Sequence, residues 1–526
     1  MKIKTFFYIC IFFILSISAS ADIKSMEKTK EKDCIRLKML DINETKLLTL
    51  RKEKVLVEPY IGKCIDENLL KELLHSLSQF YIDAGYITTK PYLKEQSIKD
   101  GRVAISVSKG LVEDIINDDT NRSDGKIKTA FIFQKRNVLN LRDLETSLEM
   151  INRVPSIDAK FEIEPGDTQG TSIVKIKTKR SSPYHLTFGA VGERSIYDDN
   201  PYLTVDFSLD NPLNINDILT LRYNTTRIQK DYQNSSGGEL DYSFPIGSYL
   251  INFTWFDFKY DQRVIGLNDT YITSGDTKGS TTKISKILFR NQLNKLTLAL
   301  SVQHKNTKNY FSGQLIDVSS YSTTLAQVDL THLFLQNWGQ ILTTYSFYRG
   351  TDWFGAKSDN DVNQAFNINN NAKLQFTKYS IDSNLMFYFP DPTYQLNSNI
   401  HLQYSDDFLY DNDKLRIGGH YSVRGYSSSY YGNNGWYINN NLLKSFTPAF
   451  STTYLQSISP FIGIDYGEIQ CQSDNVGSCG KMVGSAVGFK TDAKMLSTEF
   501  TWSRAIKKVS DQKLENLFRY SLTLKF

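Results

Sequence analysis

The chain has 526 residues and a formal net charge of +4, from 61 Lys and Arg against 57 Asp and Glu. Because the two signs are interspersed rather than gathered in one stripe, nucleic acid is not expected as a partner. Aromatic residues make up 13% of the chain, with 31 Tyr and 31 Phe. This bias favours strands over helices.

Residues 1–21 have the pattern of a secretory signal peptide, in which two lysines precede an apolar run from Phe6 to Ile17 and small residues end at Ala21. A signal anchor is the alternative, but the run is shorter than the ~20 residues that a spanning helix needs. Residues 22–33 would then form a short N-terminal segment. No later segment approaches about 18 consecutive apolar residues. The exported chain is therefore expected to be soluble or a membrane β-barrel.

The cysteines that follow the predicted signal peptide are Cys34, Cys64, Cys471 and Cys479. In an oxidising compartment the natural pairing is local, which joins Cys34 to Cys64 and Cys471 to Cys479. A zinc site is the alternative, but the two pairs lie in different halves of the chain and no histidine is spaced to join them. The sequence therefore predicts two disulfides and no metal site.

The segment from Cys34 to about residue 181 alternates helical and strand patterns in a repeated order. In DENLLKELLHSLSQFYIDAGY, Asp66 can cap a helix with one leucine-rich face, and Asn140 can cap a second helix in LNLRDLETSLEMINRVP. Two strand-like pieces follow each helix: YITTKPYL and GRVAISVS, then DAKFEIEP and TSIVKIKTK. We therefore predict two tandem α+β modules, over residues 34–110 and 111–181.

Small modules of this kind have an exposed sheet edge, to which an extended peptide can add as a further strand. We expect these edges at Tyr86–Leu93 and Asp158–Glu164. The candidate peptide-binding residues on them are Tyr86, Ile87, Tyr92, Leu93, Phe161 and Ile163.

Residues 182–526 lose the helical period and consist of short alternating runs. YLINFTW, for example, places Tyr249, Ile251, Phe253 and Trp255 on one face. Tight connections such as FPIG alternate with long polar ones such as LNDTYITSGDTKGSTTK, which is typical of an outer-membrane β-barrel in a lipid bilayer, with stacked soluble β-sandwiches as the alternative. At roughly 20 residues per strand and connection, the region accommodates about 16 antiparallel strands.

The C-terminal run FRYSLTLKF alternates apolar and polar residues and ends on Phe526. A last strand with a terminal aromatic residue resembles the signal that the outer-membrane assembly machinery reads. Phe526 is therefore the candidate assembly signal, and this machinery is an expected partner during biogenesis.

Five stretches in order along the chain carry a family resemblance. They are CIDENLLKELLHSLSQFYIDAGYITTKPYLKEQSIKDGRVAISVSKG, LNLRDLETSLEMINRVPSIDAKFEIEPGDTQGTS, DNPLNINDILTL, GGHYSVRGYS and FIGIDYG. With them the chain resembles the two-partner secretion transporters, the TpsB group of haemolysin activators and filamentous-haemagglutinin transporters. The resemblance covers nearly all of the chain after the predicted signal peptide.

The resemblance implies a function in protein export. The two modules would be periplasmic POTRA domains that capture an unfolded exoprotein, and the barrel would export it to the cell surface without ATP. The partner would be a secreted TpsA-type protein: a haemolysin, an adhesin or a contact-dependent toxin. An outer-membrane assembly factor and a passive porin are the alternatives. HExxH, GxSxG and phosphate-loop motifs are absent from the sequence, so no catalytic, cofactor or metal site is expected.

The resemblance also assigns a site in the barrel lumen. The family's VRGY motif, at the tip of a long loop folded into the barrel, corresponds to Val423, Arg424, Gly425 and Tyr426. Its inner-wall FxDxG motif corresponds to Phe461, Asp465 and Gly467, although the phenylalanine here stands four residues before the aspartate rather than two. Independently of the family, strand parity puts two glycines on the face of the aspartate, which leaves room for a loop to approach.

This assignment predicts an ion pair that holds the loop. The planar guanidinium of Arg424 would donate two hydrogen bonds to the carboxylate of Asp465 and keep a loop over residues 415–437 folded into a wet lumen. Some family members also begin with a helix that plugs the barrel. Here about 12 residues, 22–33, precede Cys34, and at 1.5 Å per residue they reach ~18 Å of a ~30 Å span. A plug helix is therefore not expected.

Overall fold

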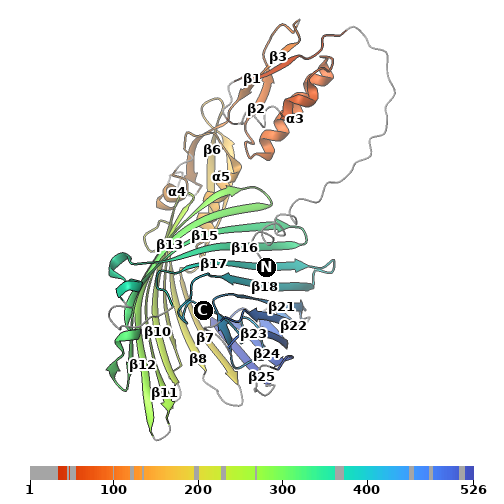
Figure 1. Cartoon of the computed structure of the whole chain (residues 1–526). Helices are drawn as coiled ribbons and strands as arrows, with labels where there is room; N and C mark the ends of the chain where they lie inside the picture. The colour runs from red at the N-terminus through yellow and green to blue at the C-terminus, as the bar shows by residue number, and fades with distance from the viewer. Residues whose placement is uncertain are drawn as a thin grey trace. The chain divides into compact units, whose positions relative to one another are not determined.

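The computed structural model of the chain (Figure 1) describes residues 34–43, 47, 55–98, 100–118, 124–132, 135–194, 201–226, 233–266, 269–361, 372–448, 455–472, 478–508 and 516–526. The predicted signal peptide and residues 22–33 lie outside the described residues. In the described part of the chain, no helix has both the length and the apolar character needed to cross a membrane.

The first module is a three-stranded sheet with a helix packed on it. Its elements are β1 (Met39–Asn43), the 3-10 turn η1 (Glu58–Tyr60), α3 (Glu67–Asp83), β2 (Lys90–Leu93) and β3 (Arg102–Ser108). β3 lies in the middle, parallel to β1 and antiparallel to β2. Asp66 caps α3 as predicted, because its side chain accepts a hydrogen bond from the Leu69 amide at 2.7 Å. Cys34 and Cys64 form a disulfide.

The strand predicted over residues 86–93 is wrong in its first half, because β2 begins at Lys90. The amide of Tyr86 donates to the Tyr81 carbonyl and that of Ile87 to the Gly85 carbonyl. Both residues therefore lie in the turn that follows α3, and Ile87 packs against the core of the second module. Neither residue is on a sheet edge, whereas Tyr92 and Leu93 are in the edge strand.

The second module repeats this plan with an additional helix. Its elements are β4 (Leu111–Asn117), α4 (Gly125–Ala130), α5 (Leu141–Asn152), β5 (Ile157–Pro165) and β6 (Thr171–Arg180), and β6 lies between β4 and β5. Asn140 caps α5 as predicted, through a 2.8 Å hydrogen bond from the Arg142 amide. β1, β4 and α4 were not predicted. β1 and α4 have only five and six residues, and a bulge between Val112 and Asp114 interrupts the alternation of β4.

The rest of the chain forms a closed barrel in which sixteen antiparallel strands of the described residues make the wall. The expected strand number is therefore confirmed. The wall strands are β7 (Tyr184–Arg194), β8 (Tyr202–Asp210), β9 (Ile218–Thr225), β10 (Gln233–Ile246), β11 (Tyr249–Ile265), β12 (Thr270–Arg290), β13 (Asn294–Phe311), β15 (Tyr321–Gln336), β16 (Gly339–Thr351), β17 (Thr377–Tyr388), β18 (Tyr394–Tyr404), β21 (Gly435–Lys444), β22 (Ser457–Ile469), β23 (Gly480–Asp492), β24 (Leu496–Ala505) and β25 (Asn516–Lys525).

The barrel closes where β25 pairs with β7. Beyond β25, Phe526 exchanges backbone hydrogen bonds of 2.9 and 3.2 Å with Leu186, and its ring meets the ring of Phe188 edge to face at 6.1 Å. The C-terminal residue is thus part of the seam, where an unpaired strand end would leave backbone groups without partners. Its role as an assembly signal stays a prediction.

The wall has an apolar outer face and a polar inner face, as the alternation predicted. Phe253 and Trp255 on β11 are exposed on the outside. Inside, polar side chains of different strands pair with one another, as Lys283 on β12 does with Asp329 on β15 at 2.9 Å. An outward apolar face matches a lipid environment and an inward polar face matches water.

The second module is joined to the barrel end that carries the short turns. Three buried polar residues lie here: Asp210 at the end of β8, and Asn216 and Asp217 in the turn that leads to β9. Asp210 accepts a hydrogen bond from the Ser156 amide at 2.7 Å, and the Asn216 side chain donates to the Lys126 carbonyl at 2.8 Å. The stretch DNPLNIND is therefore a docking surface for the module, a role that the sequence analysis did not foresee.

Glu149 in α5 and Arg153 at the end of this helix make further contacts with the barrel. Arg153 donates to the Asn216 carbonyl and to the Ser243 hydroxyl on β10. Glu149 pairs with Arg290 and, at 2.7 Å, with Lys295. Burial raises the pKa of Glu149, but the hydrogen bonds and charges of Lys295 and Arg290 outweigh burial, so the pKa lies below its ordinary value.

We predict that Arg153→Ala loosens this joint without unfolding the barrel. The lost hydrogen bonds are worth about 1 kcal/mol each, so amide exchange at the joint should rise roughly 5-fold or more. One amide at the joint is that of Gly247, which donates to the Thr129 carbonyl at 2.7 Å. Hydrogen–deuterium exchange of α4 and the β10–β11 turn measures this, with Lys160→Ala, an exposed change on β5, as the control. Equal exchange in both variants would contradict the role of Arg153.

Candidate functional site

A long loop between β18 and β21 enters the barrel. It runs from residue 405 to 434, because β18 ends at Tyr404 and β21 begins at Gly435. The loop thus starts earlier than the expected residue 415, and Tyr437 belongs to the wall. Inside it, β19 (Leu415–Ile417) and β20 (Tyr430–Gly432) form a small antiparallel pair.

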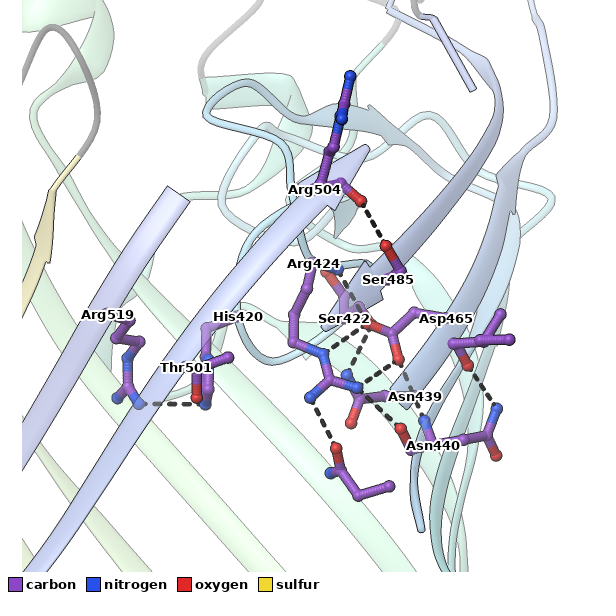
Figure 2. A network of polar contacts seen from close by, with 12 residues as sticks. His420, Ser422, Arg424, Asn439, Asn440, Asp465, Ser485, Thr501, Arg504 and Arg519 are labelled. Carbon is purple, nitrogen blue, oxygen red and sulfur yellow. Dashed lines mark hydrogen bonds and ion pairs between the residues drawn. The ribbon is translucent and has the colours of Figure 1, made fainter. Parts of the chain in front are cut away.

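Arg424 of this loop and Asp465 on β22 form a buried ion pair (Figure 2). Arg424 Nε lies 2.6 Å from Asp465 Oδ2, and Nη2 lies 2.7 Å from Oδ1. The planar fork thus donates one hydrogen bond to each carboxylate oxygen, which lysine cannot do. The two side chains are 3% and 0% exposed.

The strand beside β22 completes the coordination of both charges. Asn441 on β21 accepts a 2.7 Å hydrogen bond from Arg424 Nη1, and the Asn440 carbonyl accepts one of 2.8 Å from Nη2. Asp465 accepts two more hydrogen bonds, from the backbone amides of Arg424 at 3.0 Å and Asn440 at 3.1 Å. Both charges are therefore compensated by hydrogen bonds as well as by each other, as buried charges require.

Glycines on the wall make room for this pair. A Cβ atom at Gly463 would lie 2.2 Å from Arg424 Nη2, and one at Gly484 on β23 would lie 1.9 Å from the Arg424 carbonyl oxygen. Gly425 has a φ of +90°, and a Cβ atom there would lie 2.3 Å from the backbone nitrogen of Ala505 on β24. The close approach predicted from the glycines beside Asp465 is present, and Gly484 adds to it.

The flanking loop residues anchor the arginine on both sides. Val423 is fully buried in an apolar cluster with residues of β22 and β23, including Ile469 and Met482. The Tyr426 hydroxyl donates to the carbonyls of Val483 and Lys507 and accepts from the Val483 amide. All four residues of VRGY therefore contact the inner wall.

The wall residues of the motif lie beside the pair. Gly467 adjoins Val423, because a Cβ there would lie 2.8 Å from Val423 Cγ2. The Phe461 ring is buried, and its centroid lies 6.0 Å from the guanidinium carbon of Arg424. The structure thus brings Phe461 to the site even though its spacing from Asp465 differs from that of the family motif.

A second contact between loop and wall was missed in the sequence analysis. Arg519 on β25 lies 3.1 Å from the His420 ring and donates to the Tyr421 hydroxyl at 3.2 Å. Glu499 on β24 lies 3.6 Å from His420. No local pattern could reveal these contacts, because Arg519 is 99 and 98 positions away from the two loop residues.

A second disulfide, Cys471–Cys479, lies next to the loop. It follows β22 and precedes β23, and the Tyr431 amide of the loop donates to the Ser478 carbonyl at 2.9 Å. The disulfide therefore adjoins the β19–β20 pair.

The chain is similar to known secretion proteins along most of its length. Residues 170–491 match the family described as haemolysin secretion/activation protein ShlB/FhaC/HecB, and residues 35–110 and 111–165 match POTRA domains. The outer membrane transporter CdiB of Escherichia coli is 29% identical over 90% of this chain and 79% of its own length. The hemolysin transporter protein ShlB of Serratia marcescens is 26% identical over 88% of this chain and 81% of its own.

The fold agrees with these sequence matches. The solved structure of CdiB from Escherichia coli superposes with a TM-score of 0.84 at 26% identity, covering 96% of this chain and 93% of that one. This chain belongs to the ShlB/FhaC/HecB family. It is an outer-membrane protein of the two-partner secretion group, with its two POTRA domains in the periplasm.

The buried pair holds Arg424 of the loop against the barrel wall. The expectation of a wet site is wrong, because Arg424 and Asp465 are shielded from solvent. Removing one member of a buried pair leaves the other charge uncompensated, which typically costs about 3–5 kcal/mol. The pair therefore defines one position of the loop.

We predict that Arg424→Ala and Asp465→Ala each destabilise the docked loop by about 3–5 kcal/mol, and that the double variant is little worse than either single one. Arg424→Lys should rescue poorly, because it loses the fork. Hydrogen exchange of residues 415–432 measures docking, and heat-modifiable migration checks the barrel. Arg416→Ala, at an exposed arginine of the same loop, is the matched control. Fully additive single effects would show that the two residues act independently.

Proposed function

We propose that this chain recognises an unfolded partner protein in the periplasm through its POTRA domains and exports it to the cell surface without ATP. The observation that carries the proposal is the inserted loop, whose Arg424 pairs with Asp465 on the wall, since a segment of the chain itself occupies the interior of the pore. The family match and the two POTRA domains support it. Among the relatives, ShlB is named a hemolysin transporter, which favours a TpsA-type exoprotein as the partner here.

The free edge of the second POTRA sheet is the proposed site of recognition. β5 is the edge strand. The Ser156 carbonyl just before it accepts from the Ser181 amide, so the even-numbered residues face β6 and the backbone groups of the odd-numbered ones face away from it. At Ala159 these groups are already occupied, because the Asn152 side chain donates to its carbonyl at 2.9 Å and accepts from its amide at 2.6 Å. Phe161 and Ile163 follow with the same orientation. An extended segment of the partner can therefore pair with the second half of β5.

The docked loop is the proposed gate. A chain in transit needs the space that Arg424 and its neighbours fill, so the loop has to leave the wall or shift along it during export. Opening would break the ion pair, the hydrogen bonds of the Tyr426 hydroxyl and the apolar contacts of Val423 together, so the tip is proposed to move as a unit.

Folding of the partner outside gives the proposed direction. An unfolded segment inside the pore lacks a hydrophobic core, whereas a segment that has emerged can bury its apolar side chains and satisfy its backbone. Native stabilities of about 5–15 kcal/mol make return of a folded segment rare without any nucleotide. The outer-membrane assembly machinery would insert the barrel itself, with Phe526 in the recognised C-terminal strand.

We predict that Phe161→Pro and Ile163→Pro weaken partner binding to the POTRA region. Proline removes an outward-facing donor without breaking a hydrogen bond to β6. Phe161→Ala and Ile163→Ala, which truncate the same side chains but keep the amides, are the matched controls. Cross-linking of the partner to β5 and the amount of partner released measure the effect. Proline variants that equal their alanine controls would contradict recognition through this edge.

We also predict that deletion of residues 34–180, with the N-terminal region kept, abolishes export but leaves an ion-conducting barrel. Release of the exoprotein and conductance in planar bilayers measure the two properties separately. Retained function without the POTRA domains would favour a passive porin. Accumulation of other, unassembled outer-membrane proteins in the deletion strain would favour an assembly factor.

A further inference from the structure

The hairpin of β11 and β12 is longer than a membrane crossing requires. β11 has 17 residues and β12 has 21, whereas a tilted strand crosses a bilayer with about 9–11. The β10–β11 turn adjoins the second POTRA domain, so the surplus lies at the far, extracellular end (Figure 1). The residues beyond the membrane are not needed to close the barrel, and they present a distinct aromatic surface.

The outward face of the hairpin changes from apolar to charged after Trp255. Up to that residue it carries Phe253 and Trp255, whose aromatic rings suit the lipid and its interface. The next outward residues are Asp257 and Lys259. Asp257 lies 3.3 Å from Lys278 on β12, and Lys259 is the register partner of Asp276. Trp255 therefore marks the outer boundary of the membrane.

The inward face changes in the opposite sense at the same level. Within the membrane it is polar, with Asn252 and Thr254, and beyond it come three aromatic residues, Phe256, Phe258 and Tyr260. Their direction follows from the register, because Phe256 pairs with Gly279, which pairs with Lys305. Lys305 lines a cavity between the wall and the inserted loop. The rings therefore face the barrel interior.

Glycines on the neighbouring strands let these rings lie along the wall. A Cβ at Gly275 would lie 2.2 Å from the Tyr260 ring, and one at Gly279 would lie 2.6 Å from the Phe256 ring. Phe258 adjoins Gly237 on β10 by the same measure, at 3.0 Å, and remains 40% exposed. Each ring therefore lies beside a glycine on one side, while on the other side Phe256 has Glu239 of β10 as its register partner.

The strip of these three rings continues into the interior through Tyr260. Its hydroxyl donates to Asn309 on β13 at 3.1 Å. Asn309 lines the same cavity as Lys305, which has a volume of about 510 Å³ and apolar lining from Tyr321, Leu325, Phe376 and Tyr410. A chain in the pore therefore meets the cavity and the strip as one continuous surface.

We propose that Phe256, Phe258 and Tyr260 form an exit site that binds alternate apolar side chains of the exported chain as it emerges in extended form. This rests on the proposed export function. In a strand the rings recur every second residue, about 6.8 Å apart, which equals the spacing of same-side side chains in an extended partner. The partner's apolar residues are exposed at this stage, since its core has not formed. The strip would hold the emerged segment against return.

The proposal predicts a defect confined to the inward face. The triple variant Phe256→Thr, Phe258→Thr, Tyr260→Thr keeps β-branched residues in the strand, and Asp257→Thr, Lys259→Thr is the matched control on the outward face. The probe is a labelled 12-residue peptide of alternating Val and Ser, added to the full chain in nanodiscs. We expect the triple variant to weaken its binding about 10-fold, and the control to leave it unchanged. Equal affinities would overturn the proposal.

Secretion in cells separates this proposal from the function on which it rests. We expect the triple variant to release the exoprotein several-fold more slowly, and a photo-cross-linker at residue 258 to capture the exoprotein in transit. Normal release by the triple variant would overturn the exit site while export stands. Cross-links solely to this chain's own loops would also overturn it, since the rings would then pack an extracellular loop. A wild-type chain that releases no exoprotein would overturn both.

Discussion

The pairing of Arg424 with Asp465 is the constraint to which the interior of this barrel is adapted. A guanidinium and a carboxylate can be buried only when their remaining hydrogen-bonding groups find partners. Asn441 and the backbone of Asn440 provide these partners from the adjacent strand. Gly463 and Gly484 provide the space, because any side chain there would meet Arg424. Three neighbouring wall strands therefore carry residues whose identity is set by one arginine of a loop.

The joint between the second POTRA domain and the barrel places the proposed recognition edge. Arg153 and Ser156 bond to Ser243 on β10 and to Asp210 at the end of β8, and β5 begins at the next residue, Ile157. A partner segment paired with β5 is thus held by a strand whose start is fixed to the mouth of the barrel. The Asn152 side chain is hydrogen-bonded to the backbone of Ala159. A partner segment could therefore pair only with the C-terminal half of β5, beyond Ala159.

Much of this architecture follows from local sequence patterns. The alternation that predicted the barrel is enforced at every wall strand, because one face meets lipid and the other water, and the caps at Asp66 and Asn140 are local hydrogen bonds. Tyr86 and Ile87 were misplaced because an apolar, β-prone run was taken for a strand, whereas Gly85 and packing against the second POTRA core make it a turn. The contacts of Arg519 with His420 could not be predicted, since they depend on which side of a closed barrel a loop meets.

A buried pair of this kind can hold the loop in one position and still let it move. The large cost of losing one partner arises because the other charge stays buried and alone. Opening is different, because the loop carries Arg424 away and water enters around both groups, so that each charge regains its hydration. The Coulomb attraction that is lost is then offset by solvation, and exposed pairs are worth about 0–1 kcal/mol. The contacts of Val423 and Tyr426 with the wall would therefore set much of the resistance to opening, while the ion pair determines where the loop returns.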